Sequence, residues 1–204
     1  MKFTSQHGNA DKIHIYIDGE YAFTVYDDCP LLKNLCEGQE ISDEELALLK
    51  NEAGFRSAYE KALRLLKMRD YGEKELLKKL SLSFPAEASE RAVEKVKNYG
   101  YIDDEEYAKE VIRYLYEIKH YGIKRIRTEL IFKGINPEIA DNTLKTLDNN
   151  PIERIIVMLR SKYENGFQNE KEQKRFINKL IRLGYSFGDI KSAFRECGID
   201  IPLF

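Results

Sequence analysis

The chain has 204 residues, an apolar fraction of 43% and a net charge of −2 at pH 7. This composition excludes an intrinsically disordered protein, and no apolar run reaches the ~18 residues that a membrane-spanning helix needs. The N-terminus lacks a basic-then-apolar signal pattern, so we expect a soluble, cytoplasmic protein with no membrane partner. Three cysteines without paired spacing and three scattered histidines predict neither a disulfide framework nor a metal site.

Charge is distributed unevenly along the chain. Residues 1–60 contain five basic and twelve acidic side chains, whereas residues 154–204 contain ten basic and six acidic ones. Such an imbalance is typical of a surface that meets a charged partner. A well-solvated helical protein can show the same counts, so this pattern alone leaves both interpretations open.

The first segment predicts a β-hairpin. Apolar residues alternate in 12–17 and in 20–25, and Asp18-Gly19 between them suits the positive φ angles of a two-residue turn. An isolated hairpin is marginal in water, so a further strand or a helix must cover it. The alternation places three apolar side chains of the return strand on one face: Tyr21, Phe23 and Val25.

A connector and a helix are predicted next. Residues 30–40 suit a connector with a short helix. Ser42 and Glu45 form a capping box, which predicts a helix over 43–51. Gly54 is expected to end that helix.

From residue 55 onward the pattern is helical and repeats. Two sets of apolar residues recur every 50 residues: Leu76, Ile126 and Phe176, and Leu80, Leu130 and Leu180. Within each unit the two members lie four residues apart, on one helix face. Short helical units of this kind bury enough surface only by stacking. An ordinary helical bundle with chance periodicity is the alternative.

Three helices fit each repeat. First helices are predicted to begin at Ser57, Asp103 and Asn150-Pro151. Second helices are predicted over 73–82, 123–133 and 171–183, and third helices after Phe84-Pro85, after Asn136-Pro137 and after Ser186. The predicted fold is mostly α: three tandem three-helix repeats in an elongated curved array, behind a small N-terminal domain with a β-hairpin. The predicted ranges are 1–54 for the N-terminal capping domain and 55–102, 103–149 and 150–204 for the repeats.

Two stretches of the second repeat carry a specific pattern. Residues 100–108 read GYIDDEEYA and residues 121–135 read YGIKRIRTELIFKGI. They resemble the G-[YL]-[IL]-D-D-x-x-[FY]-A and G-x-x-[RK]-I-x-x-E-L-x-x-K-G-I segments of the RecX family, regulators of the RecA recombinase. The likeness spans nearly the whole chain and is weakest after residue 150. It departs from the family at SLSF in 81–84, which lacks the usual Lys-Gly-Phe, and at an insertion-like turn in 163–168.

The resemblance implies a non-enzymatic protein that binds the RecA–single-stranded-DNA filament in its groove. Members of the family mostly inhibit the ATPase and strand exchange of the recombinase. The implied setting is DNA repair, homologous recombination and the SOS response, and the expected form is a monomer. Direct binding of single-stranded DNA is left open.

The candidate partner-binding residues are cationic. Residues 111–133 carry six basic and two acidic side chains. Ile123, Ile126 and Leu130 are expected to face the core, so three basic side chains are expected to project away from it: Lys124, Arg125 and Arg127. The third repeat adds a basic stripe beside Phe176. The predicted contact residues are Arg113, Lys119, Lys124, Arg125, Arg127, Lys133, Lys171, Lys174, Arg175, Lys179 and Arg182. A solvated helix face is the alternative for each of them.

No catalytic residue, metal or cofactor is predicted. Asp103 and Asp104 suit helix capping better than catalysis. The chain lacks a G-x-x-x-x-G-K-[ST] phosphate loop and any nucleophile, base and orienting partner at an interpretable spacing. Two other functions remain open: a general DNA-binding helical-repeat protein, and a helical protein–protein scaffold that does not involve DNA.

Overall fold

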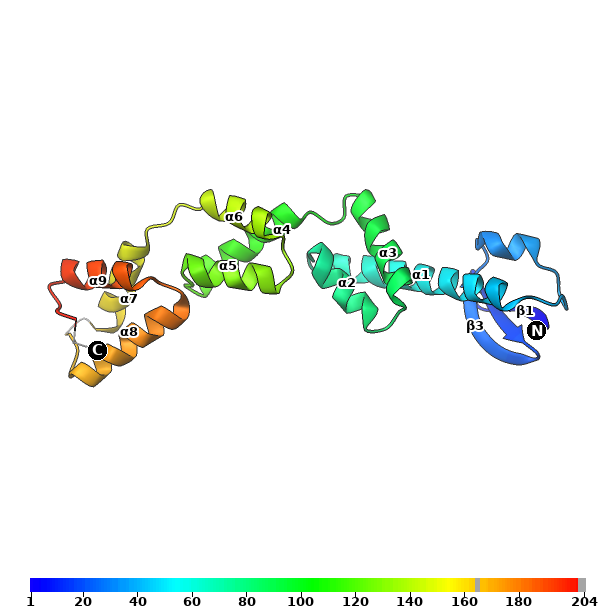
Figure 1. Ribbon diagram of the computed structural model, residues 1–204, viewed down its shortest axis with the longest axis horizontal. Helices are drawn as coiled ribbons and strands as arrows, with labels where there is room; N and C mark the ends of the chain where they lie inside the picture. The colour runs from blue at the N-terminus through cyan, green and yellow to red at the C-terminus, as the bar shows by residue number, and fades with distance from the viewer. Residues whose placement is uncertain (164–165, 202–204) are drawn as a thin grey trace. The chain divides into compact units, whose positions relative to one another are not determined.

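The computed structural model describes residues 1–163 and 166–201. Figure 1 labels its helices and strands. The chain divides into two compact units, Met1–Asp103 and Asp104–Phe204. Part of the insertion-like turn predicted at 163–168 and the last residues of the third repeat lie outside the described residues. Among the residues described, no helix is long and apolar enough to cross a membrane.

The N-terminal part is an antiparallel sheet of three strands in the order β1-β2-β3. The strands are β1 (Phe3–His7), β2 (Lys12–Ile17) and β3 (Glu20–Tyr26). The predicted hairpin is confirmed, since Asp18 and Gly19 have φ angles of 53° and 86°, as a two-residue turn requires. Strand β1 is the extra strand that the hairpin needs. Its sequence was not predicted as a strand because Phe3 is its only large apolar residue.

The predicted face of β3 is wrong for Tyr21. Ile15 pairs with Phe23 but the next residue, Tyr16, pairs with Tyr21, so Ala22 is an extra residue in a β-bulge. Because side chains alternate along a strand, the bulge turns Tyr21 to the face opposite Phe23. Tyr21 is accordingly 59% exposed.

A mostly α fold with three-helix modules follows the sheet, as predicted. A short 3₁₀ helix, η1 (Pro30–Asn34), lies in the connector. Module 1 comprises α1 (Asp43–Met68), α2 (Glu73–Ser81) and α3 (Ala86–Asn98). Module 2 comprises α4 (Asp104–Arg113), the π-helix η2 (Tyr114–Ile118), α5 (Ile123–Phe132) and α6 (Pro137–Lys145). Module 3 comprises α7 (Pro151–Lys162), α8 (Glu170–Leu183) and α9 (Phe187–Glu196).

The 50-residue apolar repeat is the core of these modules. Its six members are buried on the second helix of each module: Leu76, Leu80, Ile126, Leu130, Phe176 and Leu180. Each module has its own buried cluster, and the sheet has a further one around Ile15 and Val25. The predicted N-cap of α7 is confirmed, because the Asn150 side chain accepts a hydrogen bond from the Glu153 N–H at 3.2 Å.

Helix α1 corrects the prediction of two separate helices. Its start is as predicted: the Ser42 hydroxyl accepts from the Glu45 N–H at 3.2 Å, and the Glu45 carboxylate accepts from the Ser42 N–H at 2.8 Å. The expected end at Gly54 and the expected new start at Ser57 are wrong. The helix continues from the sheet into module 1, as Figure 1 shows.

Gly54 lies inside α1, at a position that faces α3. A Cβ atom at this position would lie 3.4 Å from the Ala88 Cβ of α3. This is an ordinary van der Waals distance, so α3 packs directly against this position, and the packing of α1 outweighs the lower helix propensity of glycine. One helix serves two cores, since Ala53 packs in the sheet cluster and Ala58 in the cluster of module 1.

Candidate partner-binding surfaces

Helix α5 presents two of its cations away from the core. Ile126 and Leu130 are buried, whereas Lys124 and Arg127 are exposed. Lys124 has no ion-pair partner among the described residues. The Arg127 guanidinium donates to the Asp141 carboxylate of α6 through two hydrogen bonds, Nε to Oδ1 at 2.6 Å and Nη2 to Oδ2 at 3.0 Å. Of the two, Lys124 can meet a partner without first breaking a contact.

The contact between Arg127 and Asp141 predicts a lowered pKa for the Asp141 carboxyl, which a titration can measure. Hydrogen bonds from the guanidinium hold the pKa of the Asp141 carboxyl below its ordinary value of 3.8. Because the pKa is depressed in the folded state, the stabilisation is present above the unfolded pKa and is lost as the pH falls through the folded pKa. An NMR titration should therefore give a pKa below 3.8 for Asp141, and Arg127→Ala should return it to the ordinary value. An Asp141 that titrates identically in both proteins would contradict this contact.

Arg125 joins modules 2 and 3 and does not project freely into solvent. Its guanidinium carbon lies 4.0 Å from the centroid of the Tyr121 ring, and its Nη1 donates to the Arg182 carbonyl oxygen at 2.8 Å. Beside it, the Gly122 N–H donates to the Leu183 carbonyl oxygen at 2.8 Å. Arg125 lies off the apolar face of α5, as expected, but its side chain already contacts module 3.

The other predicted cations of module 2 lie on different elements. Arg113, at the end of α4, pairs with Glu110 at 3.3 Å. The Nζ of Lys133 lies 5.9 Å from the centroid of the Tyr107 ring. Lys119 follows η2 and is exposed. The Nζ of Lys119 lies 5.5 Å from the centroid of the Tyr114 ring, and Lys119 also lines a pocket.

Exposed cations follow one side of α8. Four of them recur at helical spacing and are all exposed: Lys171, Arg175, Lys179 and Arg182. We call these four residues the α8 cationic stripe. None of their side chains takes part in an ion pair within the part of the chain that the structure describes. Lys174, predicted together with them, pairs with Glu170 at 3.0 Å.

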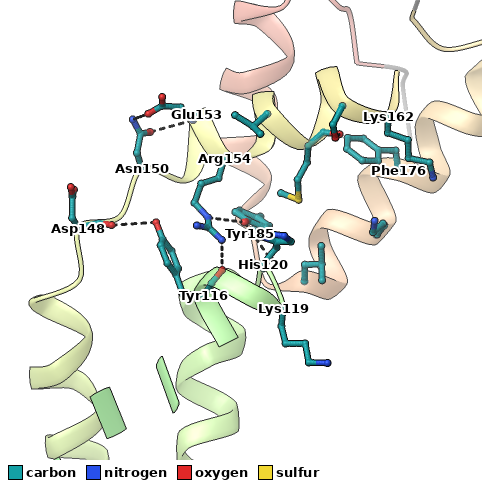
Figure 2. Close-up of a pocket in the computed structure, with 15 residues that line it drawn as sticks. Tyr116, Lys119, His120, Asp148, Asn150, Glu153, Arg154, Lys162, Phe176 and Tyr185 are labelled. Atoms are coloured by element: carbon teal, nitrogen blue, oxygen red, sulfur yellow. Dashed lines mark hydrogen bonds between the residues drawn. The ribbon is translucent and has the colours of Figure 1, made fainter. Parts of the chain in front are cut away.

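A pocket of about 630 Å³ lies where module 2 meets module 3 (Figure 2). Its lining comes from η2 and the residues after it, from α7 and from α8. It brings together two predicted cations from different modules, Lys119 and Lys179. Arg154 and Lys162 also line it. They were visible in the sequence only as two more basic residues of the third repeat, because no local pattern connects α7 to η2.

Arg154 is the fixed cation of this pocket. Its guanidinium carbon lies 3.5 Å from the centroid of the Tyr116 ring, and its Nη2 donates to the Tyr116 carbonyl oxygen at 2.5 Å. Its Nε donates to the Tyr185 hydroxyl at 3.3 Å, and that hydroxyl donates to the His120 carbonyl oxygen at 3.2 Å. Figure 2 shows the two contacts of Arg154 as dashed lines. Together they hold the two modules around the pocket.

The geometry offers binding surfaces. Across residues 1–163 and 166–201, no three side chains of His, Cys, Asp or Glu are grouped so that they could hold a metal ion. The described residues thus form tandem three-helix modules that carry an exposed cationic stripe on α8 and a cation-lined pocket.

Comparison with known proteins gives the family. A model of the second three-helix domain of RecX matches residues 103–144, and a model of the first three-helix domain of RecX matches residues 58–95. Regulatory protein RecX of Caldanaerobacter subterraneus is 31% identical over 185 residues, which cover 90% of this chain and 92% of the relative. Regulatory protein RecX of Clostridium beijerinckii is 31% identical over 189 residues, covering 92% and 88%. The chain therefore belongs to the RecX family, as residues 100–108 and 121–135 predicted.

Solved structures agree with the fold. A crystal structure of regulatory protein RecX aligns with a TM-score of 0.65 at 24% identity and covers 95% of this chain and 97% of its own. The crystal structure of RecX from Lactobacillus salivarius aligns with a TM-score of 0.59 at 23% identity and covers 71% and 97%. Both share the fold at low sequence identity.

Proposed function

We propose that the protein is a non-enzymatic regulator that binds the RecA–single-stranded-DNA filament and lowers its ATPase and strand-exchange activities. The observation that carries this proposal is membership of a family whose relatives, over nearly their full length, are named regulatory protein RecX. In this proposal the protein works in the cytoplasm as a monomer, by contact alone and without a cofactor.

The α8 cationic stripe supports a nucleoprotein as the partner. Its four side chains are exposed, and none is neutralised by an ion pair in the described residues. Such cations neutralise phosphates and release condensed counterions, which gives affinity that falls as the salt concentration rises. Lys124 of α5 offers a second contact of the same kind.

The direct test is the ATPase of RecA from the same organism on single-stranded DNA. We expect the purified protein to lower the ATPase rate when it is present at well below one copy per recombinase subunit. An ATPase rate that does not change at equimolar protein would overturn the proposal. The protein is added in two orders, either before or after the filament has assembled. Comparing the two distinguishes binding to the filament from inhibition of its growth.

General DNA binding is the second candidate, and the same α8 cationic stripe favours it, because phosphates of naked DNA would suit these side chains equally well. Affinities for free single-stranded DNA, free recombinase and the assembled filament separate the two functions. A regulator of the filament binds the filament most tightly. A general DNA-binding protein binds naked DNA no less tightly than the filament, and a scaffold unrelated to DNA binds none of the three.

A further inference from the structure

The pocket between modules 2 and 3 has an apolar floor. Val157 and Met158 of α7 and Leu183 of α8 contribute to it. Val157 is 61% exposed, which is a large fraction for a valine beside a pocket. A volume of about 630 Å³ accommodates a bulky side chain together with a short stretch of its backbone. Thioether and aliphatic groups also adapt to apolar side chains of different shapes.

Cations from three elements surround this floor. Lys119 follows η2, Lys162 ends α7 and Lys179 belongs to α8. All three are exposed, and the structure shows no ion pair for any of them in the residues it describes. Arg154 adds a fourth positive charge, held in place by Tyr116.

The acidic lining residues do not cancel this charge. Asp148 and Glu153 both line the pocket, against four cations. The Glu153 carboxylate accepts a hydrogen bond from the Asn150 side-chain amide at 3.0 Å, close to the N-terminus of α7 (Figure 2). The pocket therefore keeps a net positive charge and favours an anionic occupant.

The aromatic rings of the pocket are poorly placed for a nucleobase. Phe176 and Tyr185 are only 3% and 5% exposed, and the Arg154 guanidinium covers one face of the Tyr116 ring. Proteins that bind single strands stack bases on exposed aromatic faces. An amphipathic peptide places apolar side chains in a groove and its charges at the rim. His120, which also lines the pocket, is exposed and could stack on a base, so the test includes an oligonucleotide.

We propose that this pocket is a docking site for a short acidic, amphipathic segment of a protein partner. An apolar side chain of that segment enters over Val157 and Met158, and carboxylates on either side of it pair with Lys119, Lys162 and Lys179. The site shares Lys179 with the α8 cationic stripe, but its apolar floor and its cations from other elements suit a carboxylate-bearing peptide better than a phosphate backbone. It does not require the recombinase to be the partner.

The probe for the test is a short labelled peptide with leucines at i, i+3, i+4 and i+7 and glutamates elsewhere. We expect it to bind the full chain in a fluorescence anisotropy titration, and to bind more weakly as salt is added. A matched peptide with glutamine in place of glutamate should bind about tenfold more weakly, since the rim contacts are lost. Absence of saturable binding of the glutamate peptide would overturn the proposal.

Variants assign the binding to the pocket. The triple variant Lys119→Glu, Lys162→Glu, Lys179→Glu and the single variant Val157→Asp should each weaken peptide binding by about tenfold or more. All four side chains are exposed, and circular dichroism checks that the fold is kept. The control is Lys171→Glu with Arg175→Glu, which reverses two charges on α8 that do not line the pocket. This control should bind the peptide nearly as well as the unaltered protein.

Three results would count against the pocket. One is equal loss of peptide binding in the control and the pocket variants. Another is unaltered binding in Val157→Asp, and the third is displacement of the peptide from the pocket by an oligothymidylate, which would assign the site to nucleic acid. If the peptide fails to bind while the protein still lowers the RecA ATPase, the pocket proposal falls and the proposed function stands.

Discussion

Replacing Lys171 and Arg175 by glutamate is expected to weaken binding to the RecA–single-stranded-DNA filament by at least about tenfold, and to reduce inhibition of the ATPase in proportion. Both side chains are exposed members of the α8 cationic stripe, and neither makes an ion pair within the residues described. Their replacement therefore breaks no ion pair of the described residues. The dependence of affinity on salt should also become shallower, because fewer counterions are released on binding. Filament binding at several salt concentrations measures both effects.

A matched control comes from the same module. Lys191 and Arg195 of α9 are also exposed, and reversing their charges changes the net charge of the protein by the same amount. This control should bind the filament almost as well as the unaltered protein. Equal weakening by both double variants would mean that net charge, and not the stripe, decides affinity. Unaltered binding in both would exclude the α8 cationic stripe as the contact surface.

Charge reversal on α5 is less informative than its sequence suggests. Periodicity correctly predicts that Ile126 and Leu130 are buried. It does not predict which neighbouring group an outward-pointing basic side chain contacts. Arg125 donates to module 3 and Arg127 binds Asp141. Reversing either charge would break an internal contact, so a loss of partner binding would have two causes. Lys124 makes no ion pair among the described residues, so a change in partner binding after its charge is reversed has a single cause.

The local elements could be predicted because short-range patterns determine them. The 3.6-residue period gives the second helix of each module, and capping residues such as Ser42 and Asn150 give helix starts. What could not be predicted depends on packing between distant segments. Gly54 looks like a helix end but lies inside α1 where α3 packs on it, and one inserted residue at Ala22 turns Tyr21 to the opposite face. The candidate pocket is of the same kind, since it exists only where module 3 packs on η2.

Gly122→Ala is expected to disrupt the docking of module 3 on module 2 and to lower the free energy of unfolding by about 1–3 kcal/mol. Gly122 is the N-cap of α5 with a φ of −78°, so alanine fits its backbone conformation. The obstacle is space: a Cβ atom would lie 2.6 Å from the Gly184 carbonyl oxygen and 2.9 Å from the Tyr185 nitrogen. These are backbone atoms and cannot rotate away. Urea unfolding measures the loss.

The same substitution should also break the hydrogen bond of one specific backbone amide, that of residue 122. The Gly122 N–H donates to the Leu183 carbonyl oxygen, and moving the two backbones apart breaks this bond. Faster hydrogen exchange at residue 122 and in the residues around 183–185 would locate the damage at the junction of the modules. Exchange within the core of α8, around Phe176 and Leu180, should change less, because these residues are buried inside module 3 itself.

Gly188→Ala is the control for this prediction, since Gly188 lies in α9 and the nearest atom to its added Cβ would be the Ser186 Oγ at 3.7 Å. Alanine has the higher helix propensity, so this variant should be as stable as the unaltered protein or slightly more stable. A Gly122→Ala protein as stable as the Gly188→Ala protein would mean that the modules are not docked through Gly122 and Gly184. The pocket would then lose its basis as well, because Lys119 comes from module 2 and Lys179 from module 3. Peptide binding that weakens in Gly122→Ala but not in Gly188→Ala would connect the docking of the modules to the pocket.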